Sequence, residues 1–129
     1  MSETKFYKCN ECGNLLTMII DAGPAPVCCG SPMELLQAGV TDGAAEKHVP
    51  VIEKPDERHV VIKVGAAAHP MLDEHYIQWV AIVQGAKTQI KKLKPGKEPQ
   101  AKFSVKDNAA KPITAYEYCN LHGLWKAES

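Results

Sequence analysis

A cysteine and a histidine lie three positions apart near the C-terminal end of the sequence. Cys119 and His122 belong to the stretch Tyr118-Cys119-Asn120-Leu121-His122-Gly123-Leu124-Trp125. The residues before it, 113–118, are mostly β-branched or aromatic and contain no glycine or proline, which is typical of a strand. Cys119 is therefore predicted at a strand end, with His122 in the turn that follows. A thiol and an imidazole held in this way can form half of a metal site.

Four further cysteines lie within the first thirty residues. Cys9-Asn10-Glu11-Cys12-Gly13 has the spacing that lets two sulfurs face one ion, and Cys28-Cys29-Gly30 follows it. Four thiolates suit zinc or iron; the spacing leaves both metals open, and also a disulfide between some of the cysteines. Neighbouring side chains of an extended segment point to opposite faces. Cys28 and Cys29 are therefore expected to distort the tetrahedron around a shared ion.

All five histidines lie in the second part of the chain. Four of them are predicted at the ends of elements, where a β-sandwich gathers its loops: His48 at the opening of a strand, His69 in a loop before Pro70, His75 at the start of a long strand, and His122. A lone histidine on a strand is usually structural. His59, early in a strand, is accordingly interpreted as an ordinary surface histidine, whereas the other four form a set.

Composition and charge exclude several classes of protein. The 129 residues are 45% hydrophobic and 23% charged, close to globular averages, which argues against disordered and membrane proteins. Fifteen basic and fifteen acidic residues cancel, so no nucleic-acid partner is expected. The first apolar cluster, 15–20, is too short to span a membrane, and no targeting segment is recognised. A cytoplasmic location, without a membrane partner, is expected.

Three segments are predicted along an all-β chain. Residues 1–36 form a unit too small to be held by its core alone, so a metal staple is expected. Residues 37–45, small and polar with two glycines, are predicted to be a linker. Residues 46–129 show six or seven short strands and no long helical period, which indicates an antiparallel β-sandwich. The strands are expected at 49–54, 58–64, 75–83, 88–93, 101–105 and 113–118.

Four fragments of the second unit, in this order, resemble the superoxide reductase family. They are Glu46-Lys47-His48-Val49-Pro50, His69-Pro70-Met71, His75-Tyr76-Ile77-Gln78-Trp79 and the stretch around Cys119. The N-terminal cysteines resemble the desulforedoxin-like domain of the two-iron members, the desulfoferrodoxins. The resemblance covers nearly the whole chain. It implies a small desulforedoxin-like domain at 1–36 and an immunoglobulin-like, neelaredoxin-like catalytic domain at 46–129.

The same resemblance implies two iron ions per chain and a ligand set for each. One iron would be held by Cys9, Cys12, Cys28 and Cys29; the other would be held by His48, His69, His75 and His122 in the equatorial positions and Cys119 in the axial one, with the sixth position open. The implied activity is the one-electron reduction of superoxide to hydrogen peroxide, which protects a cytoplasm from oxidative stress. The implied partners are a rubredoxin-like electron donor and a second copy of the chain in a homodimer.

Two charged residues and two backbone groups complete the expected site. Lys47, beside His48, is predicted to attract the superoxide anion and to organise proton delivery, a role that the resemblance also implies. The resemblance further implies that the Glu46 carboxylate binds ferric iron at the sixth position after turnover. The N–H groups of Leu121 and His122 are predicted to donate hydrogen bonds to the Cys119 sulfur and so lower its electron-donor strength. The turn at 55–58 departs from the glycine-rich turn of relatives, far from the ligand motifs.

Other functions remain open at this level. A blue-copper electron-transfer protein would also place a cysteine at a strand end, but it needs a methionine after the histidine, and the last methionine here is Met71. A zinc-stabilised binding module, without enzymatic activity, would make the histidine pattern accidental. Dismutation of superoxide is a third possibility, because a sequence does not give redox potentials.

Overall fold

A computed structural model describes residues 4–39, 43, 45–107, 109 and 111–129. The chain divides after Gln37 into two compact units. Within the predicted linker at 37–45, residues 40–42 and 44 lie outside the described part. Among the described helices, none has the length and apolar character needed to cross a bilayer.

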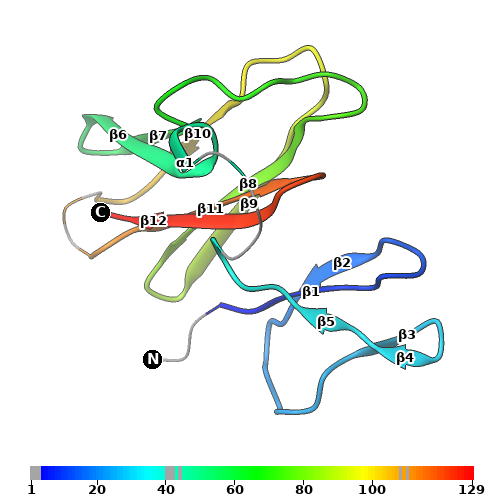
Figure 1. Cartoon of the computed structure of the whole chain (residues 1–129). Coiled ribbons are helices and arrows are strands. Elements are labelled where there is room, and N and C mark those ends of the chain that lie inside the picture. The colour runs from blue at the N-terminus through cyan, green and yellow to red at the C-terminus, as the bar shows by residue number, and fades with distance from the viewer. Residues whose placement is uncertain (1–3, 40–42, 44, 108, 110) are drawn as a thin grey trace. The chain divides into compact units, whose positions relative to one another are not determined.

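The first unit is a set of short antiparallel strands (Figure 1). One sheet has the order β2-β1-β5, and a separate hairpin pairs β3 with β4. The strands are β1 Phe6–Lys8, β2 Leu15–Thr17, β3 Val27–Cys28, β4 Ser31–Pro32 and β5 Glu34–Leu35. Tyr7, Cys9 and Met33 form its small buried cluster. Three buried residues are few for a stable fold, so the metal-binding cysteines must contribute to its stability.

The second unit is a sandwich of two antiparallel sheets. One sheet has the order β10-β7-β6 and the other the order β12-β11-β8-β9, and Figure 1 shows them with the one-turn helix α1 before β6. The elements are α1 Ala45–His48, β6 Pro50–Asp56, β7 His59–Val64, β8 Ile77–Gln84, β9 Lys87–Lys92, β10 Gln100–Ser104, β11 Thr114–Cys119 and β12 Gly123–Glu128. The predicted all-β class with a β-sandwich is confirmed.

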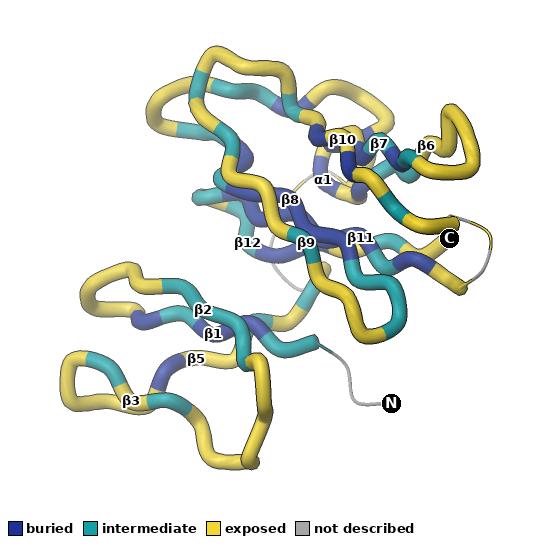
Figure 2. Tube along the Cα trace, turned by 180° about the vertical axis from the view of Figure 1, so that it is seen from behind, coloured by how far each residue is buried: buried dark blue, intermediate teal, exposed yellow. Residues whose placement is uncertain are grey.

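The core lies between the two sheets, along the dark central strands of Figure 2. Alternate residues of β7 and β10 point inward, among them Ile62 and Phe103, and they meet Val80 and Ile82 of β8. Cys119 belongs to the same buried cluster and is fully buried. Because side chains alternate along a strand, the inward-facing position of Cys119 follows from that of Ala115 on the same strand. The packed core thus fixes the direction of the Cys119 sulfur.

Several local predictions needed correction. Strand β12 was not expected, although Glu117 pairs with Trp125 across it. His48 does not open a strand but ends α1, and His75 forms an isolated bridge with Leu72 before β8 begins. The turn between β6 and β7 is Glu57-Arg58, because Pro55 and Asp56 continue β6 past an irregularity in the pairing. Edge strands tolerate proline, which is why the turn signal at Pro55 was misleading.

Candidate metal centres

Five side chains from four separate segments meet at one end of the sandwich. His48 comes from α1, His69 and His75 from the loop between β7 and β8, Cys119 from the end of β11, and His122 from the turn before β12. Their ligand atoms all lie within 4.8 Å of one another. His48, His69 and Cys119 are buried, and the other two are partly exposed. The prediction that these residues stand at element ends is confirmed, and the fold brings all five together.

The four imidazoles form a closed ring in the order 48, 69, 75, 122. Each ring meets the next edge-on: the centroids lie 4.6, 4.7, 5.0 and 4.8 Å apart and the planes cross at 75°, 84°, 74° and 85° around the circle. His48 Nε2 lies 3.1 Å from both His69 Nε2 and His122 Nδ1. The ring nitrogens therefore converge on one central point.

These separations suit a bound metal. A square with a side of 3.1 Å has its corners about 2.2 Å from its centre, near the roughly 2.0–2.1 Å of zinc–imidazole bonds. His75 Nε2 is buried and has no hydrogen-bond partner among the described residues, which is costly for a ring nitrogen unless it binds an ion. Cys119 Sγ lies 3.7 Å from His122 Nδ1. Four nitrogens and one sulfur fit a transition metal and leave a six-coordinate ion one further position.

Burial keeps the histidines neutral, which is the form that binds metals. Desolvation, with smaller contributions from the neighbouring His48, His75 and His122, lowers the pKa of His69 to about 4, although the bond to Pro70 opposes this effect. His69 Nδ1 lies 2.7 Å from the Pro70 carbonyl oxygen, so the Nδ1–H donates there and Nε2 faces the centre. Desolvation also lowers the pKa of His75, and the charges of His122 and Lys47 add to this effect.

Two backbone N–H groups donate hydrogen bonds to the Cys119 sulfur. Desolvation raises the pKa of the thiol, whereas the N–H groups of Leu121 and His122 donate to the sulfur and lower it. The prediction of these two donors is confirmed. The nearby carboxyl of Glu117, which is fully buried, raises the pKa of the Cys119 thiol further. Such hydrogen bonds to a thiolate withdraw electron density that it would otherwise give to a metal.

Helix α1, which carries the ligand residue His48, also carries two charged residues. Lys47 and Glu46 are both exposed, and the Lys47 charge reaches His75. The Glu46 carbonyl accepts a hydrogen bond from Ala67 N–H at 2.8 Å. A Cβ atom at Gly65 would lie 2.7 Å from Glu46 O, so only glycine lets α1 approach this closely. That contact could not be predicted, because Gly65 and Glu46 are far apart along the chain.

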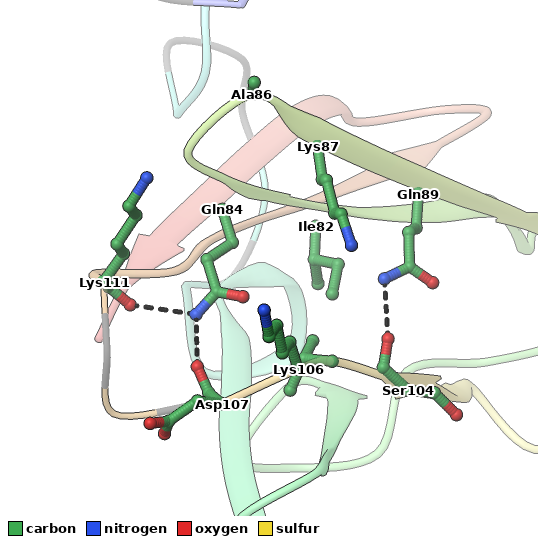
Figure 3. Close-up of a pocket in the computed structure, with 10 residues that line it drawn as sticks. Ile82, Gln84, Ala86, Lys87, Gln89, Ser104, Lys106, Asp107 and Lys111 are labelled. Carbon is green, nitrogen blue, oxygen red and sulfur yellow. Dashed lines mark hydrogen bonds between the residues drawn. The ribbon is translucent and has the colours of Figure 1, made fainter.

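The remaining histidine and a surface hollow lie outside the group. His59 Nδ1 is 2.8 Å from Asp56 Oδ1 and takes no part in either metal-binding group of the described residues. A hollow of about 500 Å³ opens beside β8 and β9, and Figure 3 shows Lys87 and Lys106 lining it. It shares no residue with the histidine group.

The four N-terminal cysteines form a second group with ligand atoms within 4.8 Å of one another. Cys12 Sγ lies 3.5 Å from Cys28 Sγ, and Cys28 Sγ lies 3.9 Å from Cys29 Sγ. A tetrahedron of sulfurs about 2.3 Å from an ion has edges of about 3.8 Å, so the group fits a single metal. All five cysteines are free, so no disulfide links them.

The adjacent cysteines share a face for a reason that the sequence did not reveal. Cys29 adopts a left-handed backbone with φ 53°, followed by Gly30 at φ 76°. The segment is therefore not extended, and the argument that neighbouring side chains must diverge does not apply. At the other knuckle, the N–H groups of Cys12 and Glu11 lower the pKa of Cys9 to about 6. That favours the thiolate, which is the form that binds metals.

Two residues that support the histidine group were not identified as functional from the sequence. Trp125 stacks on His48 with ring centroids 5.1 Å apart, and its Nε1–H donates to His122 O at 3.0 Å. Asn120 Oδ1 accepts from Tyr76 N–H at 2.9 Å. Both belong to the stretch around Cys119, but nothing in that stretch indicated which distant segments they would hold.

Comparisons with known proteins agree with this geometry. The family model described as desulfoferrodoxin matches residues 40–128, and that of the desulfoferrodoxin N-terminal domain matches residues 2–36. A desulfoferrodoxin from Nitratidesulfovibrio vulgaris is 47% identical over 128 residues, covering 99% of this chain and 98% of that protein. A superoxide reductase from Pyrococcus horikoshii is 34% identical over 74% of this chain and 94% of its own length.

A solved structure extends the likeness to the fold. The crystal structure of the superoxide reductase from Treponema pallidum superposes with a TM-score of 0.78 at 34% identity, covering 98% of this chain and 99% of that one. The family models and the full-length relatives together cover both units of the chain. The chain belongs to the desulfoferrodoxin family.

Proposed function

We propose that this protein is a superoxide reductase, an oxidoreductase that takes superoxide as its electron acceptor. Superoxide gains one electron and two protons and leaves as hydrogen peroxide. The observation that carries this proposal is the closed ring of four imidazoles completed by one cysteine. Relatives named superoxide reductase support the same chemistry. Ferrous iron held by these five ligands would supply the electron, and its one remaining position would admit a small substrate.

The ligands have distinct roles in the proposal. His48, His69, His75 and His122 are neutral donors that hold the ion without adding charge, as the lowered pKa of His69 favours. Cys119 supplies the negative charge, and the Leu121 and His122 N–H groups moderate it. Cys119 is fully buried in the core, so its sulfur would hold the ion from the side away from solvent.

Lys47 and Glu46 are the proposed catalytic residues at the solvent edge. The Lys47 ammonium attracts the superoxide anion locally, since the chain has no net charge to steer it. It also orders the water that delivers a proton. The Glu46 carboxylate, next to it on α1, would be a hard ligand suited to ferric rather than ferrous iron, and would help to displace the product.

The proposal also covers the domain organisation, the oligomeric state, the location and the electron donor of the protein. Residues 1–36 form a domain whose cysteines Cys9, Cys12, Cys28 and Cys29 hold a second iron, 37–45 are a linker, and 46–129 form the catalytic domain. The domain pair works as a homodimer in the cytoplasm. A rubredoxin-like protein returns the electron after each turnover. Support comes from the family membership and from five free cysteines, which suit a reducing compartment.

Stoichiometry tests the reaction. Reduced protein is exposed to a measured pulse of superoxide, and peroxide and oxygen are both quantified. We expect one hydrogen peroxide per superoxide consumed and no oxygen. Dismutation would release one oxygen for every two superoxide ions, and a zinc-stabilised binding module would consume none; either outcome refutes the proposal.

Two matched variants tie the activity to the ring. His69→Ala removes a buried member of the ring, and we expect the reaction to be lost. His59→Ala removes a histidine of the same unit that bonds Asp56 and lies outside the ring, and we expect no change in rate. Equal loss in both variants would show that the histidine ring is not the site.

A further inference from the structure

One short segment of the second unit carries a large excess of positive charge. Between residues 87 and 106 there are seven lysines and one acidic residue, Glu98, a formal charge of +6. The whole chain has a formal net charge of zero, so the other residues together carry −6. The segment covers β9, the loop after it and β10, which are edge strands of the two sheets. A local field of this sign therefore exists on a protein that has no overall charge.

Six lysines in or near this segment lie in two groups at opposite ends of β9. Lys92, Lys94 and Lys97 are exposed at the end where β9 runs into the following loop. Lys87, Lys106 and Lys111 border the hollow at the other end, and Figure 3 shows Lys87 and Lys106 around Ile82. Gln84 pairs with Lys87 at the far end of β8, whereas Ile77, at its near end, pairs with Cys119. The first group is therefore the one beside the metal site.

Hydrogen bonds connect the loop of the first group to the ring of histidines. Gly96 N–H, between Lys94 and Lys97, donates to Met71 O at 2.8 Å. Met71 is bonded to Pro70, whose carbonyl accepts from His69 Nδ1 at 2.7 Å. Only two hydrogen bonds and a few covalent bonds therefore separate the lysine loop from the imidazole of His69.

The loop after β9 is also bonded to β8, which in turn contacts Met71. Leu93 N–H donates to Gln78 O at 2.9 Å, and Met71 Sδ accepts from Ile77 N–H at 3.4 Å. Met71, which lies between His69 and His75 in the chain, is thus held between the lysine loop and the start of β8. A protein bound at the loop would face the metal site through fixed backbone rather than through a mobile side chain.

We propose that Lys92, Lys94 and Lys97 form the docking face for a small acidic electron-transfer protein. This inference rests on the proposed function, in which every turnover consumes one electron that superoxide does not supply. The reduced centre of the carrier is oxidised by one electron, and the ferric iron held by the histidines and Cys119 is reduced to ferrous. The Gly96–Met71–Pro70–His69 connection is the path between them.

The positive charge of the docking face favours a carrier whose surface is acidic. Opposite surface charges raise association rates by about 10-fold to 1,000-fold at low salt, which suits a partner that must dock and leave at every turnover. Surface charges more than about 8 Å apart are largely screened at physiological salt, so the lysines at the docking face matter more than those at the hollow.

Two charge-reversal variants test the docking face. Lys92→Glu/Lys94→Glu/Lys97→Glu reverses the face, and Lys87→Glu/Lys106→Glu/Lys111→Glu makes the same change of charge at the hollow. The measurement is stopped-flow reduction of the oxidised iron protein by a reduced rubredoxin of net negative charge, at several salt concentrations. We expect the face variant to be slowed at least about tenfold at low salt, with a flattened salt dependence. At physiological salt, where the screening length is about 8 Å, we expect the hollow variant to stay within about threefold of wild type while the face variant remains slower.

The opposite results are equally informative. Equal slowing of both variants would show that only net charge matters, and no slowing of either would show that the carrier docks elsewhere; both overturn the proposal. If the face variant is poorly folded, Lys92→Gln/Lys94→Gln/Lys97→Gln replaces it, with the corresponding glutamine variant at the hollow. The rate of the prereduced proteins with superoxide is measured alongside. Failure of that reaction in the wild type would refute the proposed function, independently of the docking result.

Discussion

Asn120 and Tyr76 are joined by two hydrogen bonds across 44 residues of sequence. Tyr76 N–H donates to Asn120 Oδ1 at 2.9 Å, and Asn120 N–H donates to Tyr76 O at 3.2 Å. The Asn120 Nδ2 group also donates to Glu74 O at 3.0 Å. One side chain therefore holds the main chain on both sides of His75 and fastens it to the turn that carries Cys119 and His122.

Removing this amide is predicted to loosen the metal site. In Asn120→Ala both side-chain hydrogen bonds are lost, and metal affinity is expected to fall about 10-fold to 100-fold, as for other groups that orient ligands. Stability should fall by about 1–3 kcal/mol, at roughly 1 kcal/mol for each bond. Competition between the protein and a chelator for cobalt(II), followed by the thiolate absorption band, measures the affinity.

Two variants sharpen the Asn120 experiment. Asn120→Asp keeps the acceptor for Tyr76 N–H but loses the donor to Glu74 O, so an intermediate affinity is expected. Asn10→Ala removes an exposed asparagine that bonds Glu34 in the small unit, and it should leave the cobalt(II) affinity of the histidine group unchanged. An Asn120→Ala protein with wild-type affinity would show that the amide does not position His75.

Lys47 is predicted to accelerate the reaction with superoxide. Lys47→Ala removes the positive charge that reaches His75 from α1, so the second-order rate should fall by about tenfold at low salt. Pulse radiolysis of the prereduced protein gives this rate. Lys54→Ala, which removes an exposed lysine of β6, is the control and should react like wild type. A Lys47→Ala rate within about twofold of wild type would remove Lys47 from the mechanism.

Glu117 is predicted to make the protein less stable as the pH rises. Its side chain is fully buried and neither carboxyl oxygen has a hydrogen-bond partner among the described residues. Desolvation raises its pKa from 4.5 to about 9. Between these two values the folded protein binds more protons than the unfolded chain, so stability falls with rising pH, by up to about 1.4 kcal/mol per pH unit.

The variant Glu117→Gln isolates this contribution. It has no proton to lose, so its stability relative to wild type should increase steadily when urea unfolding of the metal-loaded proteins is measured at pH 6, 7 and 8. Glu128→Gln, at an exposed position of β12, should leave the pH dependence of wild type unchanged. Parallel curves for Glu117→Gln and wild type would mean that the Glu117 carboxyl titrates normally in the folded protein.

The four-cysteine group is predicted to stabilise the small unit without taking part in superoxide reduction. Cys12→Ser should lower the metal content from two ions per chain to one and increase hydrogen exchange in β1 and β2, because Tyr7, Cys9 and Met33 provide little core. The rate of the prereduced protein with superoxide should stay within about twofold of wild type. Asn10→Ala, in the same knuckle, should keep both metals. A large loss of superoxide reactivity in Cys12→Ser would assign this group a catalytic role.

The sequence by itself, through the resemblance of its motifs to a known family, indicated which side chains belong to the two metal groups. It placed Cys119 and His69 correctly in their elements but not His48 and His75. Cys119 follows a run of strand-forming residues, so its place at a strand end could be predicted from local preference alone. His69 before Pro70 was predictable as a loop residue for a similar reason. These are short-range properties, which neighbouring residues set.

Only the tertiary structure decided how those side chains meet. His48 and His122 are 74 residues apart, and their order around the ring depends on how α1 packs against the turn before β12. Strand β12 was missed although it forms a tight hairpin with β11, because Gly, Lys, Ala and Glu, which make up most of it, are residue types depleted in strands. The left-handed backbone at Cys29 and the hydrogen bond between Gly96 and Met71 could not be predicted either. A dihedral angle and a contact between distant segments are selected by the energy of the whole packed fold, which local patterns do not encode.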